Sequence, residues 1–383
     1  MAPEALARRL RAGDAASVLD VRDRPEFESW HVDGRRVTAR QVPHVKFVAA
    51  GATGDATDPL PDDLSEPIVV VCGRGAASAE VASDLAAAGV DAVNLAGGMD
   101  AWAETYLAEP VVDDDDLAVI QYQRPSSGCL AYLVVAGDDA VVIDPLRAFA
   151  DRYVADAAAR DATIVRAVDT HVHADHVSGV RAVADAAGAR ATVPAGARER
   201  GLAFAADLVA DGDEIRVGDA TLTAVDAPGH TSEQICLRLD RAGDAPSVLF
   251  SGDALFLGSV GRPDLEAGES GARGLAERAY ETLHDRLLAL PDDTILAPGH
   301  VADVADAGGL DGRPAVYAAP LSAVRDLDVL ALDRESFLDR VASSLPPRPA
   351  NHERIVAANL GTATMDDETA FEAELGPNNC AIE

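Results

Sequence analysis

The stretch "THVHADHVSG" at residues 170–179 holds three of the nine histidines of the chain within six positions. His171, His173 and His176 occur there with Asp175, directly after the apolar run "TIVRAV". Imidazole and carboxylate groups together are the ligands that zinc, iron and manganese accept in proteins. If the segment is extended, His171 and His173 point to the same side. We expect Asp175 and His176 to open the following helix.

Three further apolar segments end at a histidine or an aspartate. "TLTAVDAPGH" ends at His230, "SVLFSGD" at Asp253 and "TILAPGH" at His300. Strand ends that meet at one edge of a sheet can carry chemistry in their loops while the sheet fixes the distances. A purely structural polar cluster is the alternative, but seven such groups after four strands favour a metal site.

The N-terminal part, residues 1–108, alternates short strands with helices. "PIVVVCG" at 67–73 is typical of a buried strand, and "AASAEVASDLAAAGV" at 76–90 is typical of a helix. Strands separated by helices predict a parallel α/β sheet. The acidic run "EPVVDDDDLAV" at 109–119 is interpreted either as a solvated linker or as the first edge of a new domain.

Residues 112–310 form a second predicted domain, in which apolar strands recur between amphipathic helices. "AYLVVAG" and "AVVIDP" predict a hairpin that turns around Asp138–Asp139. Residues 311–383 form a C-terminal extension. We expect helices near 334–344 and 351–358 there, followed by a tail that contains glycine and proline.

The chain is strongly acidic, with a net charge of −33, and only Lys46 among its 32 basic residues is a lysine. This charge disfavours nucleic acid and anionic membranes as partners. A site for a cationic ligand is one explanation of this negative charge. The favoured explanation is that the protein is halophilic, because the short Debye length at high salt removes most of the repulsion between its acidic groups. The sequence shows neither a long apolar run nor a signal-peptide pattern, so we expect a cytoplasmic protein.

The four cysteines are widely spaced and form no CxxC pair, which disfavours a disulfide framework or a zinc knuckle. Cys72 ends an apolar strand and begins "CGRGAAS", just before a predicted helix. Backbone N–H groups and a helix N-terminus at that place favour the thiolate. The alternative is a small buried apolar side chain, which is the interpretation we prefer for Cys236. For Cys129, a buried structural role and a catalytic one stay open.

"THVHADH", "APGHT", "SGDALF" and "APGH" together resemble the metallo-β-lactamase superfamily. The resemblance implies an αββα sandwich of two mixed sheets. "SSGCLAYLV" at 126–134 and "SGDALFLGSVGRPDL" at 251–265 resemble persulfide dioxygenases of that superfamily, especially microbial ones fused to a rhodanese domain. This resemblance implies one Fe²⁺ per chain with the ligands His171, His230 and Asp253. The remaining residues would support these ligands or bind a second metal; they are His173, Asp175, His176 and His300.

The resemblance implies that a low-molecular-weight thiol persulfide and O₂ react to give sulfite and thiol. Arg262 in "GRPDL" would contact the anionic end of the substrate or orient its loop, and an ion pair with Asp264 is the alternative. The same residues could hold the two Zn²⁺ ions of a glyoxalase II-type hydroxyacyl-thiol hydrolase, so the residues alone leave iron and zinc open. The oligomeric state also stays open, and a homo-oligomer is one of the options.

"LDVRDRPEFESWHVDG" at 19–34, the Cys72 loop and "NLAGGMDAW" at 94–102 resemble a rhodanese domain. The resemblance implies that Cys72 carries sulfane sulfur as a persulfide, with thiosulfate sulfurtransfer as an added activity. Ala77 stands where the family often has arginine, which leaves the sulfur donor open. A sulfur carrier with an inactive metal domain is a third interpretation of the chain. Cys380 in the tail is a minor candidate for a residue that relays persulfide sulfur. The persulfide would be held by Gly73, Arg74, Gly75 and Ser78.

Overall fold

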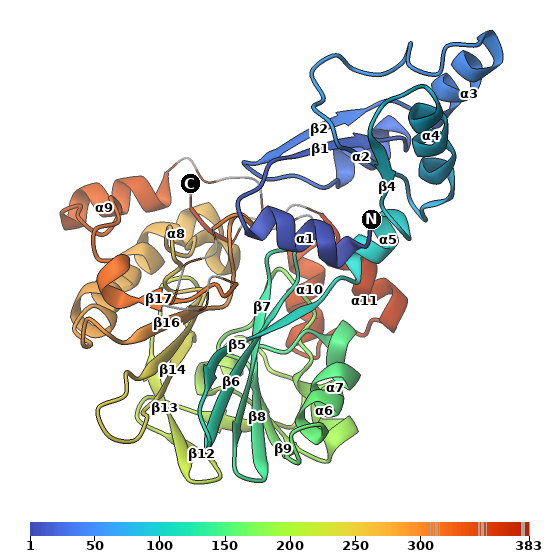
Figure 1. Cartoon of the computed structure of the whole chain (residues 1–383). Helices are drawn as coiled ribbons and strands as arrows, with labels where there is room; N and C mark the ends of the chain where they lie inside the picture. Colours follow the sequence, from blue (N-terminus) through green and yellow to red (C-terminus); the bar gives the residue numbers. More distant parts are fainter. Residues whose placement is uncertain are drawn as a thin grey trace.

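The computed structural model describes residues 1–306, 308, 310, 313, 315–343, 345, 348–349, 351–376 and 380–382. These residues form three sheets with helices packed on their faces (Figure 1). No helix in these ranges has the length and apolar character needed to cross a bilayer. The predicted fold class, a parallel α/β domain followed by an αββα sandwich and C-terminal helices, is confirmed.

The N-terminal domain is a parallel sheet with the strand order β2-β1-β3-β4. All residues of β3 are buried, because helices cover both faces of the sheet. Val69 packs with α1 and α5, whereas Val70 packs with α3 and α4 on the opposite face. The elements are α1 (Pro3–Arg11), β1 (Ala16–Asp20), α2 (Arg24–Ser29), β2 (Val37–Gln41), α3 (His44–Thr53), β3 (Ile68–Val71), α4 (Ala76–Ala87), β4 (Ala92–Asn94) and α5 (Gly98–Ala103).

The first sheet of the sandwich has the order β11-β10-β9-β8-β7-β6-β5. Its strands are antiparallel from β5 to β8 and parallel from β8 to β11. The predicted hairpin is present as β7 and β8. The strands are β5 (Leu107–Asp113), β6 (Leu117–Gln123), β7 (Leu130–Ala136), β8 (Asp139–Ile143), β9 (Thr163–Val168), β10 (Arg190–Pro194) and β11 (Asp207–Val209).

The second sheet has the order β12-β13-β14-β15-β16-β17 and is mixed, because β15 and β16 run parallel. The parallel pairing places the segments that follow β15 and β16 at the same edge of the sheet. These segments contain the predicted site residues Asp253 and His300. The strands are β12 (Glu214–Val217), β13 (Ala220–Asp226), β14 (Ile235–Leu239), β15 (Val248–Gly252), β16 (Ile295–Pro298) and β17 (Ala319–Pro320).

The core of the sandwich lies between the two sheets, where Tyr132 and Val134 of one sheet pack with Leu237 and Phe250 of the other. Helices α6 (Ala150–Ala158) and α7 (Val180–Ala187) cover the outer face of the first sheet. The outer face of the second sheet is covered by α8 (Asp264–Glu281), by the π-helical turn η3 (Thr282–Leu287) and by α9 (Arg334–Ala342) (Figure 1). The short 3₁₀ helices are η1 (Arg147–Phe149), η2 (Ala195–Arg198) and η4 (Leu321–Ala323).

The acidic run at 109–119 is part of the sandwich. β5 and β6 form an antiparallel hairpin, and Asp114, Asp115 and Asp116 form its turn. The run thus forms an edge hairpin of the seven-stranded sheet. The apolar residues Val111 and Val112 are buried in the hairpin, while the aspartates at its tip are exposed.

The C-terminal extension packs on the sandwich through α9, α10 (His352–Asn359) and α11 (Asp367–Ala373). The first two helices were predicted, but α11 was not, because the segment was interpreted as a tail. Asp366 caps α11 by accepting a hydrogen bond from the backbone N–H of Thr369 at 2.8 Å. At the end of the chain, Ala381 pairs with Gly261 in an antiparallel bridge, which returns the tail to the metal domain.

The two domains meet through buried polar contacts. Arg11 of α1 donates to Gln123 of β6 at 2.7 Å and pairs with Glu109 at 2.9 Å. The Nε of Arg124 donates to the carbonyl oxygen of Ala103, at the end of α5, at 3.1 Å. The N-terminal domain is thus attached directly to the loop that leads into β7.

Candidate metal centre

Three predicted ligands converge after strands of both sheets. His171 follows β9, His230 follows β13, and Asp253 follows β15 directly. Asp253 Oδ2 lies 4.0 Å from His171 Nε2 and 3.7 Å from His230 Nε2. All three side chains are buried, and these three atoms have no hydrogen-bond partner among the described residues. Buried polar atoms of this kind are costly unless something binds them, so the donor set fits a metal ion.

The hydrogen bonds of the Nδ1 atoms of His171 and His230 determine which ring nitrogen is available to bind a metal. His230 Nδ1–H donates to the carbonyl oxygen of Arg262 at 2.8 Å. The hydroxyl of Thr170 donates to Asp144 at 2.9 Å, so its oxygen accepts from His171 Nδ1–H at 3.0 Å. Both Nε2 atoms therefore keep an unshared electron pair that is directed at Asp253, as metal ligation requires.

Burial of the three ligands favours their neutral forms. Burial lowers the pKa of His171 well below its usual value and lowers the pKa of His230 to about 4. Burial, helped by the charge of Asp175, raises the pKa of Asp253 well above its usual value. Neutral imidazoles are the form that binds metals, and a divalent cation would favour the ionised carboxylate. The set is thus suited to a cation.

His173 has a different environment from His171. Its Nε2–H donates to Asp144 at 3.2 Å, and Asp169 lies 3.7 Å away. Burial lowers the pKa of His173, but the charge of Asp144 and its hydrogen bond outweigh burial and raise the pKa to about 10. Its Nε2 is thus held by Asp144, and its ring lies beside that of His171, with 4.1 Å between the two ring centroids.

Two expectations about this loop are wrong. Residues 169–179 are irregular, so the alternation of an extended strand does not apply to His171 and His173. Asp175 and His176 do not open the next helix, because α7 begins at Val180. The loop is closed by the hydroxyl of Ser178, which donates to Asp169 at 2.6 Å.

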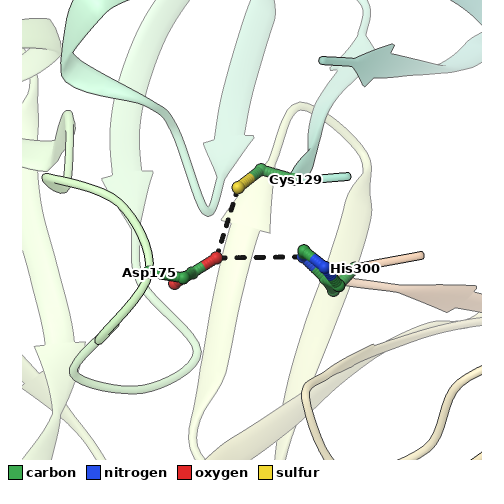
Figure 2. Close-up of side chains that lie close together, drawn as sticks. All are labelled: Cys129, Asp175 and His300. Atoms are coloured by element: carbon green, nitrogen blue, oxygen red, sulfur yellow. Dashed lines mark hydrogen bonds and ion pairs between the residues drawn. The ribbon is translucent and has the colours of Figure 1, made fainter. Parts of the chain in front are cut away.

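Asp175 is the centre of a second cluster (Figure 2). Its Oδ2 accepts from the thiol of Cys129 at 3.2 Å and lies 3.9 Å from Nδ1 of His300. Its Oδ1 lies 3.2 Å from Nδ1 of His176. Burial, and then the charge of Asp175, raise the pKa of the Cys129 thiol well above its usual value. Asp175 and His300, two of the four predicted second-site residues, thus lie beside the Cys129 thiol.

The candidate ligands fall into several groups. Within the described residues, the ligand atoms of Asp253 converge with those of His171 and His230. Asp175 converges with His300 and Cys129 in one group and with His173 and His176 in another. The residues could thus hold an ion at the Asp253 cluster and offer further candidate ligands around Asp175.

Arg262 is buried and paired with Asp264, to which its Nε and Nη2 donate at 2.7 and 3.0 Å. Its carbonyl oxygen orients His230, as described above. Gly261 precedes it, and a side chain there would lie 1.9 Å from the carbonyl oxygen of Asp253. This close approach brings the loop with Arg262 against the metal ligands, while contact with a substrate stays a prediction.

A cavity of about 280 Å³ lies between the two domains, and its walls include Trp30 and Trp102. The opposite wall contains Gly128, next to Cys129, and Val301, next to His300. Gly128 has a φ of +77°, and a Cβ there would lie 2.3 Å from the carbonyl oxygen of Val301. The cavity therefore borders the Asp175 cluster.

The Cys72 loop lies between β3 and α4. The backbone N–H of Gly75 donates to the sulfur at 3.1 Å, and the Ser78 hydroxyl lies 3.2 Å from it. Burial raises the pKa of Cys72, but the hydrogen bonds from Ser78, Gly75 and Arg74 outweigh burial and lower it. Arg74 and Gly73 form the outer part of the loop. The predicted loop thus stabilises a sulfur anion, and Ala77 leaves no guanidinium at its position.

Replacing Ser78 by alanine is expected to raise the pKa of Cys72, because a hydroxyl that can donate to the sulfur anion is lost. The pH dependence of alkylation by iodoacetamide measures this shift, with slower reaction at neutral pH. Ser83 is exposed on the same helix, so Ser83→Ala is the matched control. An unchanged alkylation profile for Ser78→Ala would contradict the role of this hydroxyl.

Several supporting residues were not predicted. Asp144 was interpreted only as part of a hairpin, yet it binds both Thr170 and His173. Its φ of +50° is unusual for a residue other than glycine, and such conformations concentrate at functional sites. Asn359 and Glu374, in the C-terminal extension, hydrogen-bond to the loop that carries the histidines. Local sequence contains no signal for such contacts.

Comparisons with known proteins agree with this geometry. The family model of the metallo-β-lactamase superfamily matches residues 125–300, and that of the rhodanese-like domain matches residues 2–105. The mitochondrial persulfide dioxygenase ETHE1 of Homo sapiens is 32% identical over 262 residues, which cover 63% of this chain and 86% of that protein. The chain therefore belongs to the metallo-β-lactamase superfamily and begins with a rhodanese-like domain.

Two further similar proteins have different names. A hydroxyacylglutathione hydrolase of Polaromonas sp. is 37% identical over 174 residues, which cover 44% of this chain and 60% of that protein. The crystal structure of ETHE1 from Myxococcus xanthus is 30% identical with a TM-score of 0.53, covering 64% of this chain and 99% of that one. Similarity alone thus leaves both activities open.

Proposed function

We propose that this chain is an iron-dependent persulfide dioxygenase whose N-terminal domain carries sulfane sulfur on Cys72. The observation that carries the proposal is the converging donor set of His171, His230 and Asp253. Two imidazoles and one carboxylate on one side of an ion are typical of non-haem Fe²⁺ oxygenases, because they leave positions for substrate and O₂. A bound Fe²⁺ would supply the activation of O₂.

The residues around the ion have separate tasks in this reaction. His171, His230 and Asp253 would hold the ion, and His173, which is hydrogen-bonded to Asp144, lies beside them. The cavity between the domains is a suitable entry for a small thiol persulfide. The overall reaction consumes one persulfide, one O₂ and one water and yields one thiol, one sulfite and two protons.

A binuclear zinc hydrolase of hydroxyacyl-thiol esters is the second candidate. It is favoured by the identity of 37% with the hydroxyacylglutathione hydrolase of Polaromonas sp.. What favours the dioxygenase over it is the group of His171, His230 and Asp253, which by itself suffices for one ion.

Metal content and oxygen uptake distinguish the two candidates. The full chain is purified without oxygen at molar salt, its metals are quantified, and O₂ consumption and sulfite are followed with glutathione persulfide. We expect one iron per chain, equal amounts of O₂ and sulfite, and loss of activity when iron is chelated. Two zincs per chain together with thioester hydrolysis and no O₂ uptake would establish the hydrolase instead.

A further inference from the structure

The C-terminal extension contacts the metal-ligand loop, residues 171–178, through the buried side chain of Asn359. Its Nδ2 donates to the carbonyl oxygens of His173 and His176, both at 2.9 Å. Its Oδ1 accepts from the backbone N–H of Ser178 at 2.8 Å. One amide at the end of α10 therefore connects three backbone groups along the loop.

A second buried side chain of the extension, Glu374, lies just after α11. Its Oε1 accepts from the backbone N–H of Val177 at 2.8 Å, and its Oε2 pairs with Nη1 of Arg124. The guanidinium of Arg124 lies between the rings of Phe149 and Phe371, 5.4 and 5.0 Å from their centroids. The side chains of this ion pair are almost fully buried, which makes the loss of one partner costly.

The loop needs such partners because only its end is paired by backbone, in a bridge between Ser178 and Leu146 that leaves two N–H groups unsatisfied. β9 ends at Val168 and α7 begins at Val180, so neither a ladder nor a helix satisfies the N–H groups of Val177 and Ser178. Buried backbone donors without a partner are strongly unfavourable. Glu374 and Asn359 satisfy both groups and thereby select one conformation of the loop.

We propose that Asn359 and Glu374 are positioning residues of the metal centre. They fix the backbone that carries His171, His173 and His176, and so the directions of the ligand atoms. The extension is thus part of the site, although it contributes no ligand through these residues. The inference goes beyond the proposed function, because it holds for a dioxygenase and for a hydrolase alike.

Asn359→Asp keeps the acceptor for Ser178 but removes the donor to two carbonyl oxygens. Glu374→Gln keeps an acceptor for Val177 but removes the charge that pairs with Arg124. For each variant we expect the affinity of the metal-free protein for Co²⁺ to fall by about 10- to 100-fold, as for other residues that orient metal ligands. The visible spectrum of bound Co²⁺ should change as well, since it reports ligand geometry.

Asp367→Asn is the matched control, because Asp367 is an exposed residue of α11 that pairs with Arg147. Thermal unfolding of the metal-free protein reports whether the variants fold. Neither persulfide nor O₂ is present, so the result is independent of the proposed reaction. Wild-type Co²⁺ affinity and spectrum in folded Asn359→Asp or Glu374→Gln would overturn the proposal. A loss explained entirely by the unfolded fraction would overturn it too.

Discussion

Replacing His230 by alanine is expected to remove metal binding and oxygen uptake while sulfur transfer by Cys72 continues. The donor set then retains only His171 and Asp253, and the third ligand cannot be supplied by His173, which is held by Asp144. Metal-ion catalysis is worth several kcal/mol, so O₂ consumption should fall by about 10³-fold or more. Metal analysis, an oxygen electrode and a thiosulfate sulfurtransfer assay on one preparation measure the three quantities.

His352→Gln is the control, because His352 lies at the start of α10 and its ring contacts only the carbonyl oxygen of Pro349 among the described interactions. It should keep metal and both activities. If His230→Ala still consumed O₂ with persulfide at the wild-type rate, the Asp253 cluster would not be the site of the reaction. If wild-type protein showed sulfur transfer as its whole activity, the chain would be a carrier with an inactive metal domain.

The positions of the ligands along the chain could be predicted because each follows an apolar strand. Asp253 and His300 come after β15 and β16, which are parallel neighbours, so their proximity follows from strand direction alone. The orientation of the side chains could not be predicted in this way. His171 and His173 are separated by one residue, but Thr170 and Asp144 direct the first toward Asp253 and hold the second away.

The contribution of the C-terminal extension could not be predicted from local sequence. Glu374 binds a backbone group 197 positions earlier in the chain, and Asn359 binds one 183 positions earlier. Periodicity reports which face of a helix is apolar, and it contains no information about such distant polar partners. The missed helix α11 is the scaffold that brings Glu374 to the loop.

The two centres are attached to the same short helix. At the start of α5, the backbone N–H of Met99 donates to the carbonyl oxygen of Cys72 at 2.9 Å. Gly98 is required there, because a Cβ would lie 2.1 Å from that oxygen. At its end, the carbonyl oxygen of Ala103 accepts from Arg124, the partner of Glu374. These contacts hold the rhodanese-like domain and the metal domain in one fixed arrangement, which for the proposed sulfur transfer would raise the effective concentration of one site at the other.

Cys72→Ser is expected to abolish sulfur transfer from thiosulfate, with a loss of about 10³-fold or more, because a serine hydroxyl is not ionised at neutral pH. Oxidation of an added low-molecular-weight persulfide should stay within about twofold, because the metal ligands are untouched and only one interaction at a distant site changes. Initial rates of thiocyanate formation and of O₂ uptake measure the two activities.

Cys236→Ala is the matched control, since Cys236 is buried in β14 and its thiol contacts the carbonyl oxygen of Ser251 at 3.6 Å. Both rates should stay near wild type in this variant. Full sulfur transfer by Cys72→Ser would assign the carrier role to another thiol. A fall in O₂ uptake as steep as the fall in sulfur transfer would mean that the metal centre receives its persulfide only from Cys72. The two domains would then catalyse consecutive steps of one reaction instead of two separate reactions.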